Sequence, residues 1–363
     1  MNVIIVGAGI AGSAIAYEMA RRGARVRLID ARAPGRGATF ASAGILSPAI
    51  EGHDPELLRL TSCSLGLYDE FIRRVQIDSS REIDYARSGT LQVAFTPEQA
   101  EVLADNARRL ESAGVDNTVL GAGDARALEP ALSASITAAL RLPTQGYVSA
   151  EQLIAALVAA IEKRGATNVT SRVDHVEDSS SVARVITASG TFEADAVVMA
   201  TGSWAVPPMD VVRPAPVKPI RGQLLHLRVD ERVASQVLWG PECYIVPWRD
   251  MSVLVGATVE DVGFEESATV EGVRTLLTAA AQMVPAIDRA RFQEVRVGLR
   301  PKTSDELPAI GRSSTMPHVF HATGLYRNGV LLAPLAAMLV ADLVLEGREH
   351  DELALVRPDR LGL

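Results

Sequence analysis

The sequence predicts an α/β fold with two lobes, a Rossmann-like domain built from discontinuous segments and a second domain formed by an antiparallel sheet. Three observations lead to this prediction. A strand–helix–strand pattern opens the chain, two later strands end in small-residue turns within 196–202 and 318–332, and residues 89–94 and 217–256 are typical of antiparallel strands. We expect the first domain at 1–85, 145–215 and 296–363, and the second at 86–144 and 216–295.

The first thirty residues contain the elements of a βαβ unit. An apolar strand is expected at 3–6, a helix at 10–22 and a second strand at 25–29. Gly23 stands where a helix C-cap belongs, and the small Ala16 lies on the helix face that meets the sheet. This context distinguishes the glycines at the start of the helix from those of an ordinary turn.

The glycines and the acid of this unit predict that it binds an adenine dinucleotide. Gly7 permits the tight turn, Gly9 lets backbone N–H groups approach a pyrophosphate, and Gly12 lets the helix pack closely against the strand. Asp30 follows Gly12 by eighteen residues and is placed to accept hydrogen bonds from a ribose 2′-hydroxyl. Because an aspartate would repel the 2′-phosphate of NADP, the motif favours FAD or NAD.

Two further helices can be placed from their end signals. Ser149 and Gln152 form a capping box ahead of a helix that ends at Gly165, and a strand is expected at 168–173. The apolar run 330–345 is interrupted by a proline and an aspartate and is too short for a membrane span. We expect it to form a buried helix.

The composition argues against several classes of partner. The chain has 363 residues, a net charge of −8 and 4% aromatic residues, which provide neither a basic stripe nor stacking platforms for nucleic acid. Cys63 and Cys243 lie far apart and outside any Cys/His cluster, so we expect packed thiols, no disulfide framework and no metal site. The first strand leaves no room for a signal peptide, and we expect a cytoplasmic protein without a membrane partner.

Four blocks of sequence carry a family resemblance. They are GAGIAGSAIAYEMARRG near the N-terminus, RGATFASAGIL at 36–46, VGLRPKTSDELPAIG at 297–311 and GLYRNGVLLAP at 324–334. In these blocks the chain resembles the D-amino acid oxidase superfamily of FAD enzymes, and within it the glycine oxidases of the ThiO type. The first block is common to many flavoproteins, whereas the last two are more specific. The resemblance covers essentially the whole chain and implies FAD rather than a nicotinamide cofactor.

The blocks imply a set of contacts to FAD. The turn after Gly324 leads into a helix expected to begin near Gly329, whose N–H groups and positive end would face the negative edge of a reduced flavin. The small residues at 38–45 would let the cofactor lie against backbone, and Val173 matches the position that brackets the adenine in the resembling enzymes. The expected cofactor-binding residues are Gly7, Gly9, Ile10, Ala11, Gly12, Asp30, Ala31, Ala38, Thr39, Ala43, Gly44, Ile45, Val173, Gly202, Leu325, Tyr326, Arg327, Asn328, Gly329, Val330 and Leu331.

The resemblance also implies three residues that hold and orient the substrate, namely Tyr244, Arg300 and Arg327. Arginine suits a carboxylate because its planar guanidinium makes two parallel charge-assisted hydrogen bonds. A structural role stays open for each residue. Arg300 could form a buried ion pair with Asp305, Tyr244 could be a core aromatic of a hairpin that turns at 249–250, and Arg327 could be a surface cap.

The implied reaction is the oxidation of glycine, sarcosine or another small (D-)amino acid. The α-hydrogen leaves as a hydride to FAD, and the imino acid hydrolyses to a 2-oxo acid and ammonia, with dioxygen as acceptor and hydrogen peroxide as product. Gly298 or Leu299 stands where sarcosine oxidases carry the cysteine that binds flavin covalently, so we expect noncovalent FAD. Val259 stands near the position of the lysine that those enzymes place over the flavin, which leaves an oxidase and a dehydrogenase both open.

Several alternatives remain at this point. Within the superfamily they are a D-amino acid dehydrogenase, a sarcosine oxidase and a 2-hydroxy-acid oxidase. From other classes they are a non-catalytic FAD-binding subunit and an NAD-dependent dehydrogenase, the latter on the N-terminal motif alone. The resemblance further implies a homotetramer and a role in thiamine biosynthesis, for which nothing else in the sequence argues.

Overall fold

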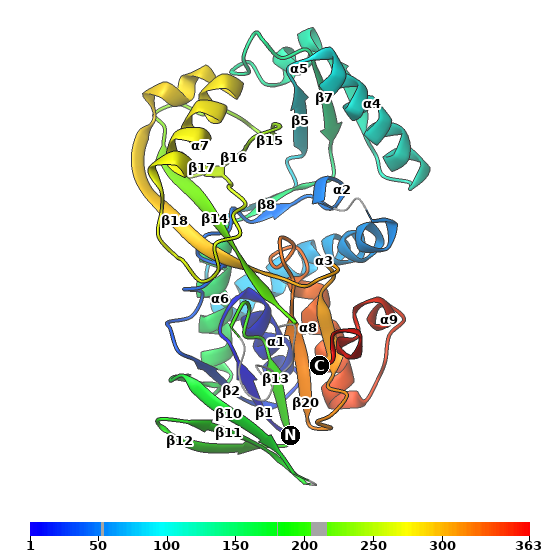
Figure 1. The fold of residues 1–363 in the computed structure, drawn as a ribbon, viewed down its shortest axis with the longest axis vertical. Coiled ribbons are helices and arrows are strands. Elements are labelled where there is room, and N and C mark those ends of the chain that lie inside the picture. The colour runs from blue at the N-terminus through cyan, green and yellow to red at the C-terminus, as the bar shows by residue number, and fades with distance from the viewer. Residues whose placement is uncertain (52–53, 180, 205–215) are drawn as a thin grey trace.

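The computed structural model describes residues 1–51, 54–179, 181–204 and 216–363 and has two lobes (Figure 1). The end of the predicted domain segment 145–215 therefore lies outside the described residues. The lower lobe contains a six-stranded sheet in the order β19-β20-β13-β1-β2-β9, parallel except for β19. Its strands are β1 (Asn2–Val6), β2 (Arg25–Asp30), β9 (Thr167–Thr170), β13 (Ala196–Met199), β19 (Ala309–Arg312) and β20 (Val319–Thr323).

Different elements cover the two faces of this sheet. Val3 and Ile5 of β1 pack against helices, whereas Ile4 and Val6 face a small antiparallel sheet, as the alternation of side chains along a strand requires. The helices are α1 (Ile10–Arg21), α3 (Pro55–Ser79), α6 (Ala150–Lys163) and α8 (Ala333–Glu346), and the small sheet contains β10 (Val173–Asp178), β11 (Ala183–Thr187) and β12 (Gly190–Ala194).

The glycines of the N-terminal unit are needed where the chain passes closest to itself. A Cβ at Gly7, whose φ is +108°, would overlap the carbonyl oxygen of Ala200 on the neighbouring strand connection. A Cβ at Gly12 would overlap the carbonyl oxygen of Gly7, so helix and strand can approach only without a side chain there. Helix α1 ends at Arg21, and Gly23 follows with a φ of +87°. The predicted strands, helix and helix end of this unit are confirmed.

The upper lobe contains an eight-stranded sheet in the order β18-β14-β17-β16-β15-β5-β7-β6. Leu225 and Val255 face the core under helix α7, while Leu224 and Leu254 belong to the cluster on the opposite face. The predicted hairpin at 249–250 is present between β16 and β17. The strands are β5 (Thr90–Ala94), β6 (Thr118–Gly121), β7 (Ala138–Leu142), β14 (Lys218–Arg228), β15 (Val237–Trp239), β16 (Tyr244–Pro247), β17 (Ser252–Gly256) and β18 (Arg291–Lys302).

The lobes are joined by long strands and by a small sheet. Figure 1 shows β14 and β18 running together from the upper lobe toward the lower one, and β18 contains the predicted domain boundary at residue 296. The predicted division into segments stays a prediction. The remaining elements are β3 (Ile45–Leu46), β4 (Tyr85–Ala86), β8 (Gly146–Val148), α2 (Pro48–Glu51), α4 (Pro97–Ser112), α5 (Ala122–Leu128), α7 (Val270–Met283), α9 (Glu352–Val356) and the short 3-10 helices η2 (Pro285–Arg289) and η3 (Pro358–Leu361).

Two expected elements and one expected burial are wrong. The helix expected near Gly329 begins at Ala333, because the preceding residues form turns and a proline occupies the first helical turn. The strand expected at 168–173 is two strands in different sheets, which separate where the Ser171 N–H donates to the Asp30 carbonyl over 2.8 Å. Cys63 is exposed on α3 instead of packed. In the part of the chain that is described, no helix is long and apolar enough to cross a membrane.

Candidate active site

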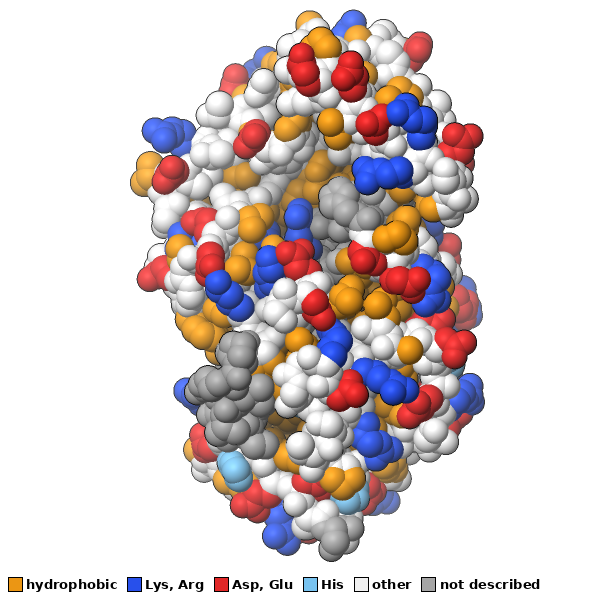
Figure 2. All heavy atoms as spheres, turned by 45° about the vertical axis from the view of Figure 1, so that its right-hand side comes forward, with side chains coloured by type: hydrophobic (Ala, Val, Ile, Leu, Met, Phe, Trp, Pro, Cys, Tyr) orange, Lys and Arg blue, Asp and Glu red, His pale blue; other side chains and the backbone are white. Residues whose placement is uncertain are grey.

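A cavity of about 630 Å³ is lined by residues from both lobes. Its walls include the N-terminus of α1, the loop 36–45, the start of β10, the loop before β16, the end of β18 and the turn after β20. Figure 2 shows a hollow on this face of the molecule with basic side chains at its margin. All the predicted substrate and cofactor residues line this cavity except Gly12, which lies behind it at the contact of helix and strand.

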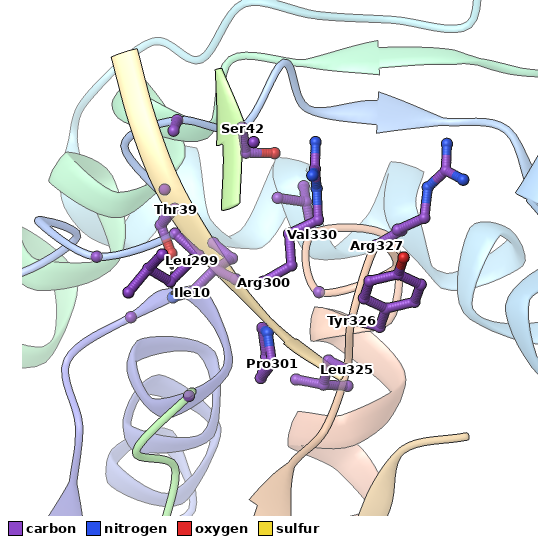
Figure 3. Close-up of a pocket in the computed structure, with 18 of the residues that line it drawn as sticks. Ile10, Thr39, Ser42, Leu299, Arg300, Pro301, Leu325, Tyr326, Arg327 and Val330 are labelled. Carbon is purple, nitrogen blue, oxygen red and sulfur yellow. Dashed lines mark hydrogen bonds between the residues drawn. The ribbon is translucent and has the colours of Figure 1, made fainter. Parts of the chain in front are cut away.

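One end of the cavity is built to face an anion. Gly9, Ile10 and Ala11 line it with the first turn of α1, a helix of twelve residues with no acid in that turn. Free N–H groups and the positive end of the helix dipole attract a phosphate at such a position. The Ile10 N–H donates to the Thr39 hydroxyl over 3.0 Å, which holds the loop 36–45 against the helix (Figure 3).

Asp30 lies at the same end, at the carboxyl end of β2. Its carboxylate accepts hydrogen bonds from the backbone N–H of Ala8 at 2.7 Å and of Arg32 at 2.8 Å. These bonds hold the side chain at the cavity wall. Because each carboxylate oxygen has two lone pairs, each can accept one further hydrogen bond from a ligand.

The turn after β20 is held in an unusual backbone shape. Gly324 has a φ of +68° and Tyr326 a φ of +45°, and the Tyr326 N–H donates to the Pro301 carbonyl over 2.9 Å. Two hydroxyls of α3 support the end of the turn, since Ser64 donates to the Leu331 carbonyl at 2.6 Å and Tyr68 donates to the Val330 carbonyl. The role of these two hydroxyls was not predicted from the sequence. Ser64 and Tyr68 lie four residues apart and so share one face of α3, which is the only indication of it that the sequence contains.

Two buried polar atoms of the cavity wall have no hydrogen-bond partner among the described residues. They are the Thr201 hydroxyl oxygen and the Asn328 side-chain carbonyl oxygen. A buried polar group without a partner costs free energy, so each of these atoms suits a polar group of a bound molecule. Together with the anion-facing helix, they fit a cofactor that carries both a pyrophosphate and a polar heterocycle.

Arg300 extends from β18 into the cavity and is not part of an ion pair with any described residue. Its Nη1 donates to the carbonyl of Thr258 at 2.9 Å and, more weakly, to that of Arg221 at 3.4 Å. Within the described chain, Nε and Nη2 have no hydrogen-bond partner. Asp305 pairs with Arg360 at 2.7 Å, so the alternative of an Arg300–Asp305 ion pair is wrong.

Tyr244 and Arg327 reach the same cavity from different segments. Tyr244 begins β16 and is half-buried, and its ring centroid lies 5.2 Å from that of Trp239. Arg327 is exposed and follows Tyr326 in the turn. Figure 3 shows Arg300 and Arg327 extending toward the same side of the cavity. Tyr244 and Arg327 each have further interactions in addition to lining the cavity.

Other lining residues were not anticipated from the sequence. Trp239, Glu242 and Cys243 line the cavity at the loop between β15 and β16. Burial raises the pKa of Cys243 to about 12, so this thiol stays protonated at neutral pH. Gly298 passes so close to the loop 36–45 that a Cβ there would lie 2.8 Å from the Cβ of Ala41. Among the described residues, no cluster of His, Cys, Asp and Glu could hold a metal ion.

A mainly parallel sheet with a glycine-rich helix start, a second lobe built on a mainly antiparallel sheet in which only β15 and β5 pair in parallel among the described strands, and a cavity lined by both lobes are the features of a dinucleotide-binding enzyme. Residues 2–343 match the DAO family model, described as FAD dependent oxidoreductase. The chain therefore belongs to this family of FAD-dependent oxidoreductases, and FAD is its cofactor.

Individual relatives agree with this assignment. The chain is 34% identical over 348 residues to the glycine oxidase of Geobacillus kaustophilus, covering 94% of this chain and 92% of that protein. The crystal structure of glycine oxidase from Geobacillus kaustophilus superposes with a TM-score of 0.93 at 33% identity, covering 98% of this chain and 97% of that one. The chain is 35% identical over 364 residues to the bifunctional protein ThiO/ThiG of Nostoc sp. strain PCC 7120, covering 97% of this chain but only 54% of that protein. It thus spans about half the length of such bifunctional relatives.

Proposed function

We propose that this protein catalyses the FAD-dependent oxidative deamination of glycine or another small amino acid. The proposal rests on the environment of Arg300. This arginine lines the cavity, pairs with no carboxylate of the described chain and donates hydrogen bonds only to backbone carbonyls. A substrate carboxylate would complete its hydrogen bonds with the geometry that a guanidinium prefers. The similarity to proteins named glycine oxidase supports the choice of substrate class.

The cofactor is proposed to lie along the cavity from α1 to the turn after β20. Gly9, Ile10 and Ala11 would face its pyrophosphate, and Asp30 would accept from its ribose. Val173 would border the adenine. The turn at 325–331, with the unpartnered Asn328 oxygen, would contact the flavin ring. The other predicted cofactor residues line the cavity between these points, and Gly12 would act through the packing of α1.

The chemistry divides between cofactor and protein. When bound, FAD would supply the redox chemistry: it would serve as the acceptor for the hydride of the substrate α-carbon, and its reoxidation by dioxygen would yield hydrogen peroxide. Arg300 binds the substrate carboxylate through its Nε and Nη2 donors, Tyr244 contributes a hydroxyl beside it, and Arg327 adds positive charge at the cavity mouth. These contacts orient the α-carbon and thereby convert binding energy into rate. Water then hydrolyses the imino acid to a 2-oxo acid and ammonia.

Finer properties are proposed from the sequence and its resemblance rather than from the structure. They are dioxygen as the acceptor, noncovalent attachment of FAD, assembly as a homotetramer, a cytoplasmic location and a contribution to thiamine biosynthesis. The similarity to ThiO/ThiG supports the last of these. A D-amino acid dehydrogenase, a sarcosine oxidase and a 2-hydroxy-acid oxidase differ from the proposed enzyme in the acceptor or the substrate that they use. A panel of amino acids and hydroxy acids, assayed with dioxygen and with an artificial electron acceptor, distinguishes them.

Replacing Arg300 tests the proposal. We expect Arg300→Ala to raise the KM for glycine by a factor of about 100 while FAD stays bound, because a bidentate charge-assisted contact is lost. Arg228→Ala is the matched control, since Arg228 is an exposed arginine at the end of the adjacent strand β14, outside the cavity. An unchanged KM in Arg300→Ala would contradict the assignment of this residue.

A further inference from the structure

A buried polar cluster lies on the face of β14 that points away from the cavity. Gly222 lines the cavity, so by the alternation along a strand its neighbours Arg221 and Gln223 point to the other side, toward helix α7. Gln223 confirms this direction, because its side chain exchanges hydrogen bonds with Thr269, the N-cap residue of α7. We call Arg221, Gln223, Thr258, Glu260 and Thr269 the Glu260 cluster.

Glu260 is the acceptor at the centre of this cluster. One carboxylate oxygen accepts from Arg221 Nη2 at 2.5 Å, and the other accepts from the Thr258 hydroxyl at 2.6 Å and from Gln223 Nε2 at 2.8 Å. The Arg221 side chain is 6% exposed and Gln223 is 0% exposed. Burial alone would raise the pKa of Glu260, but the hydrogen bonds from its three partners outweigh burial and hold the pKa below its ordinary value. Glu260 is therefore ionised at neutral pH.

The cluster fixes two pieces of backbone against each other. Arg221 and Glu260 exchange backbone hydrogen bonds of 2.8 and 3.0 Å, and Thr258 pairs with Gln223 through both its backbone N–H and its hydroxyl. These contacts continue the pairing of β14 with the segment that follows β17. Side chains on one face of the sheet thus set the position of carbonyl groups that are used on the other face.

Those carbonyl groups hold Arg300. The acceptors of Arg300 Nη1 are the carbonyls of Thr258 and Arg221, and both residues contribute their side chains to the Glu260 cluster. The Arg300 side chain crosses directly over Gly222, between these two acceptors. A change in the separation of β14 and residues 258–260 would move both acceptors and turn the guanidinium.

We propose that Glu260 is a positioning residue for substrate binding: through Arg221 and Thr258 it fixes the carbonyls that orient Arg300 toward the substrate carboxylate. The inference rests on the proposed function of Arg300 and adds a residue that never touches substrate. It also explains why an ionised carboxylate lies behind the cavity rather than in it.

The test measures the affinity of the holoenzyme for acetate, a carboxylate without an amino group to oxidise, from the change in flavin absorbance. We expect Glu260→Gln to weaken acetate binding about tenfold, because a misplacement of the order of 1 Å is costly at an oriented contact. The KM for glycine should rise by a similar factor, with a smaller change in kcat. Glu294→Gln is the matched control, since Glu294 pairs with the buried Arg296 on β18 at 2.8 Å but has no contact with Arg300.

Arg300→Ala, alone and combined with Glu260→Gln, separates the possible failures. If Glu260 acts through Arg300, Glu260→Gln weakens acetate binding in the wild-type protein and has no further effect in Arg300→Ala. If only Arg300→Ala weakens binding, or if the two effects multiply, the inference is overturned while the role of Arg300 stands. If Arg300→Ala has no effect, the proposed function of Arg300 fails, and the inference fails with it. Should Glu260→Gln lose FAD, Thr258→Val removes one hydrogen bond to Glu260, and an unchanged acetate affinity in that variant would likewise overturn the inference.

Discussion

Gly222→Ala is expected to impair substrate binding without unfolding the protein. Gly222 is buried at the cavity wall, and the Arg300 guanidinium lies against its backbone. A Cβ at this position would lie 2.5 Å from Arg300 Cζ and would overlap both Nη atoms. Ordinary contacts between such atoms are about 3.5 Å, so the guanidinium must move by about 1 Å.

The size of the effect follows from which atoms move. The end of a flexible arginine can turn away at little cost to the fold, so we expect a loss of less than about 1 kcal/mol in the free energy of unfolding. The carboxylate site cannot tolerate the same shift. A hydrogen bond to a charged group contributes about 1.5 to 3 kcal/mol, so losing one of two such bonds predicts a KM for glycine raised by about 10- to 100-fold.

Steady-state kinetics with glycine, urea unfolding and the visible spectrum of bound FAD together check this prediction. Gly66→Ala is the control, because Gly66 is an exposed glycine of α3 with no atom within 4 Å of an added Cβ. That variant should keep the wild-type KM. A Gly222→Ala enzyme that keeps both FAD and the wild-type KM would refute the placement of Arg300 at the substrate carboxylate.

Two further predictions concern FAD retention and pH. Gly12→Ala places a Cβ on the carbonyl oxygen of Gly7, which is backbone and cannot turn away, so the purified variant should show a reduced ratio of flavin to protein absorbance, whereas Gly66→Ala should not. His321 is buried on β20, and burial lowers its pKa from 6.5 to about 4. The unfolded chain therefore takes up a proton first as the pH falls, and the free energy of unfolding should decrease by up to about 3 kcal/mol between pH 6.5 and 4. In His321→Asn, the free energy of unfolding measured by urea titration should depend less on pH between 6.5 and 4. The same pH dependence in the variant and the wild-type protein would contradict the lowered pKa of His321.

Secondary structure is predicted best from the sequence where several residues of a segment require the same backbone conformation. Gly7, Gly12 and Gly23 occupy positions that a side chain would block or strain, so the βαβ unit could be placed to within a residue or two. The start of α8 was misplaced, because the turns at 329–332 resemble a helix in sequence and only the proline at the next turn marks the true start. The strand at 168–173 was merged for a similar reason, since apolar periodicity does not show where a chain passes from one sheet to another.

The residues that line the candidate site could be predicted from the sequence, but the groups that hold those residues in place could not. The resemblance implies that Arg300 binds the substrate. The groups that accept hydrogen bonds from its guanidinium are backbone carbonyls, which every residue type has, so the sequence cannot identify them. The hydroxyls of Ser64 and Tyr68 support the turn from more than 260 positions away in the chain. The place of Glu260 could not be predicted either, because it follows β17 and only its pairing with Arg221 of β14 shows that it lies behind the cavity wall.

Under the proposed function, FAD bound in the cavity oxidises a small amino acid held by Arg300. This is tested most directly by mixing the purified protein anaerobically with glycine while following the flavin band at about 450 nm. We expect this band to be lost on mixing, to return when dioxygen is admitted, and to be lost much less readily in Arg300→Ala at the same glycine concentration. A band that is unchanged by glycine, sarcosine and D-alanine in the wild-type protein would contradict the proposed function.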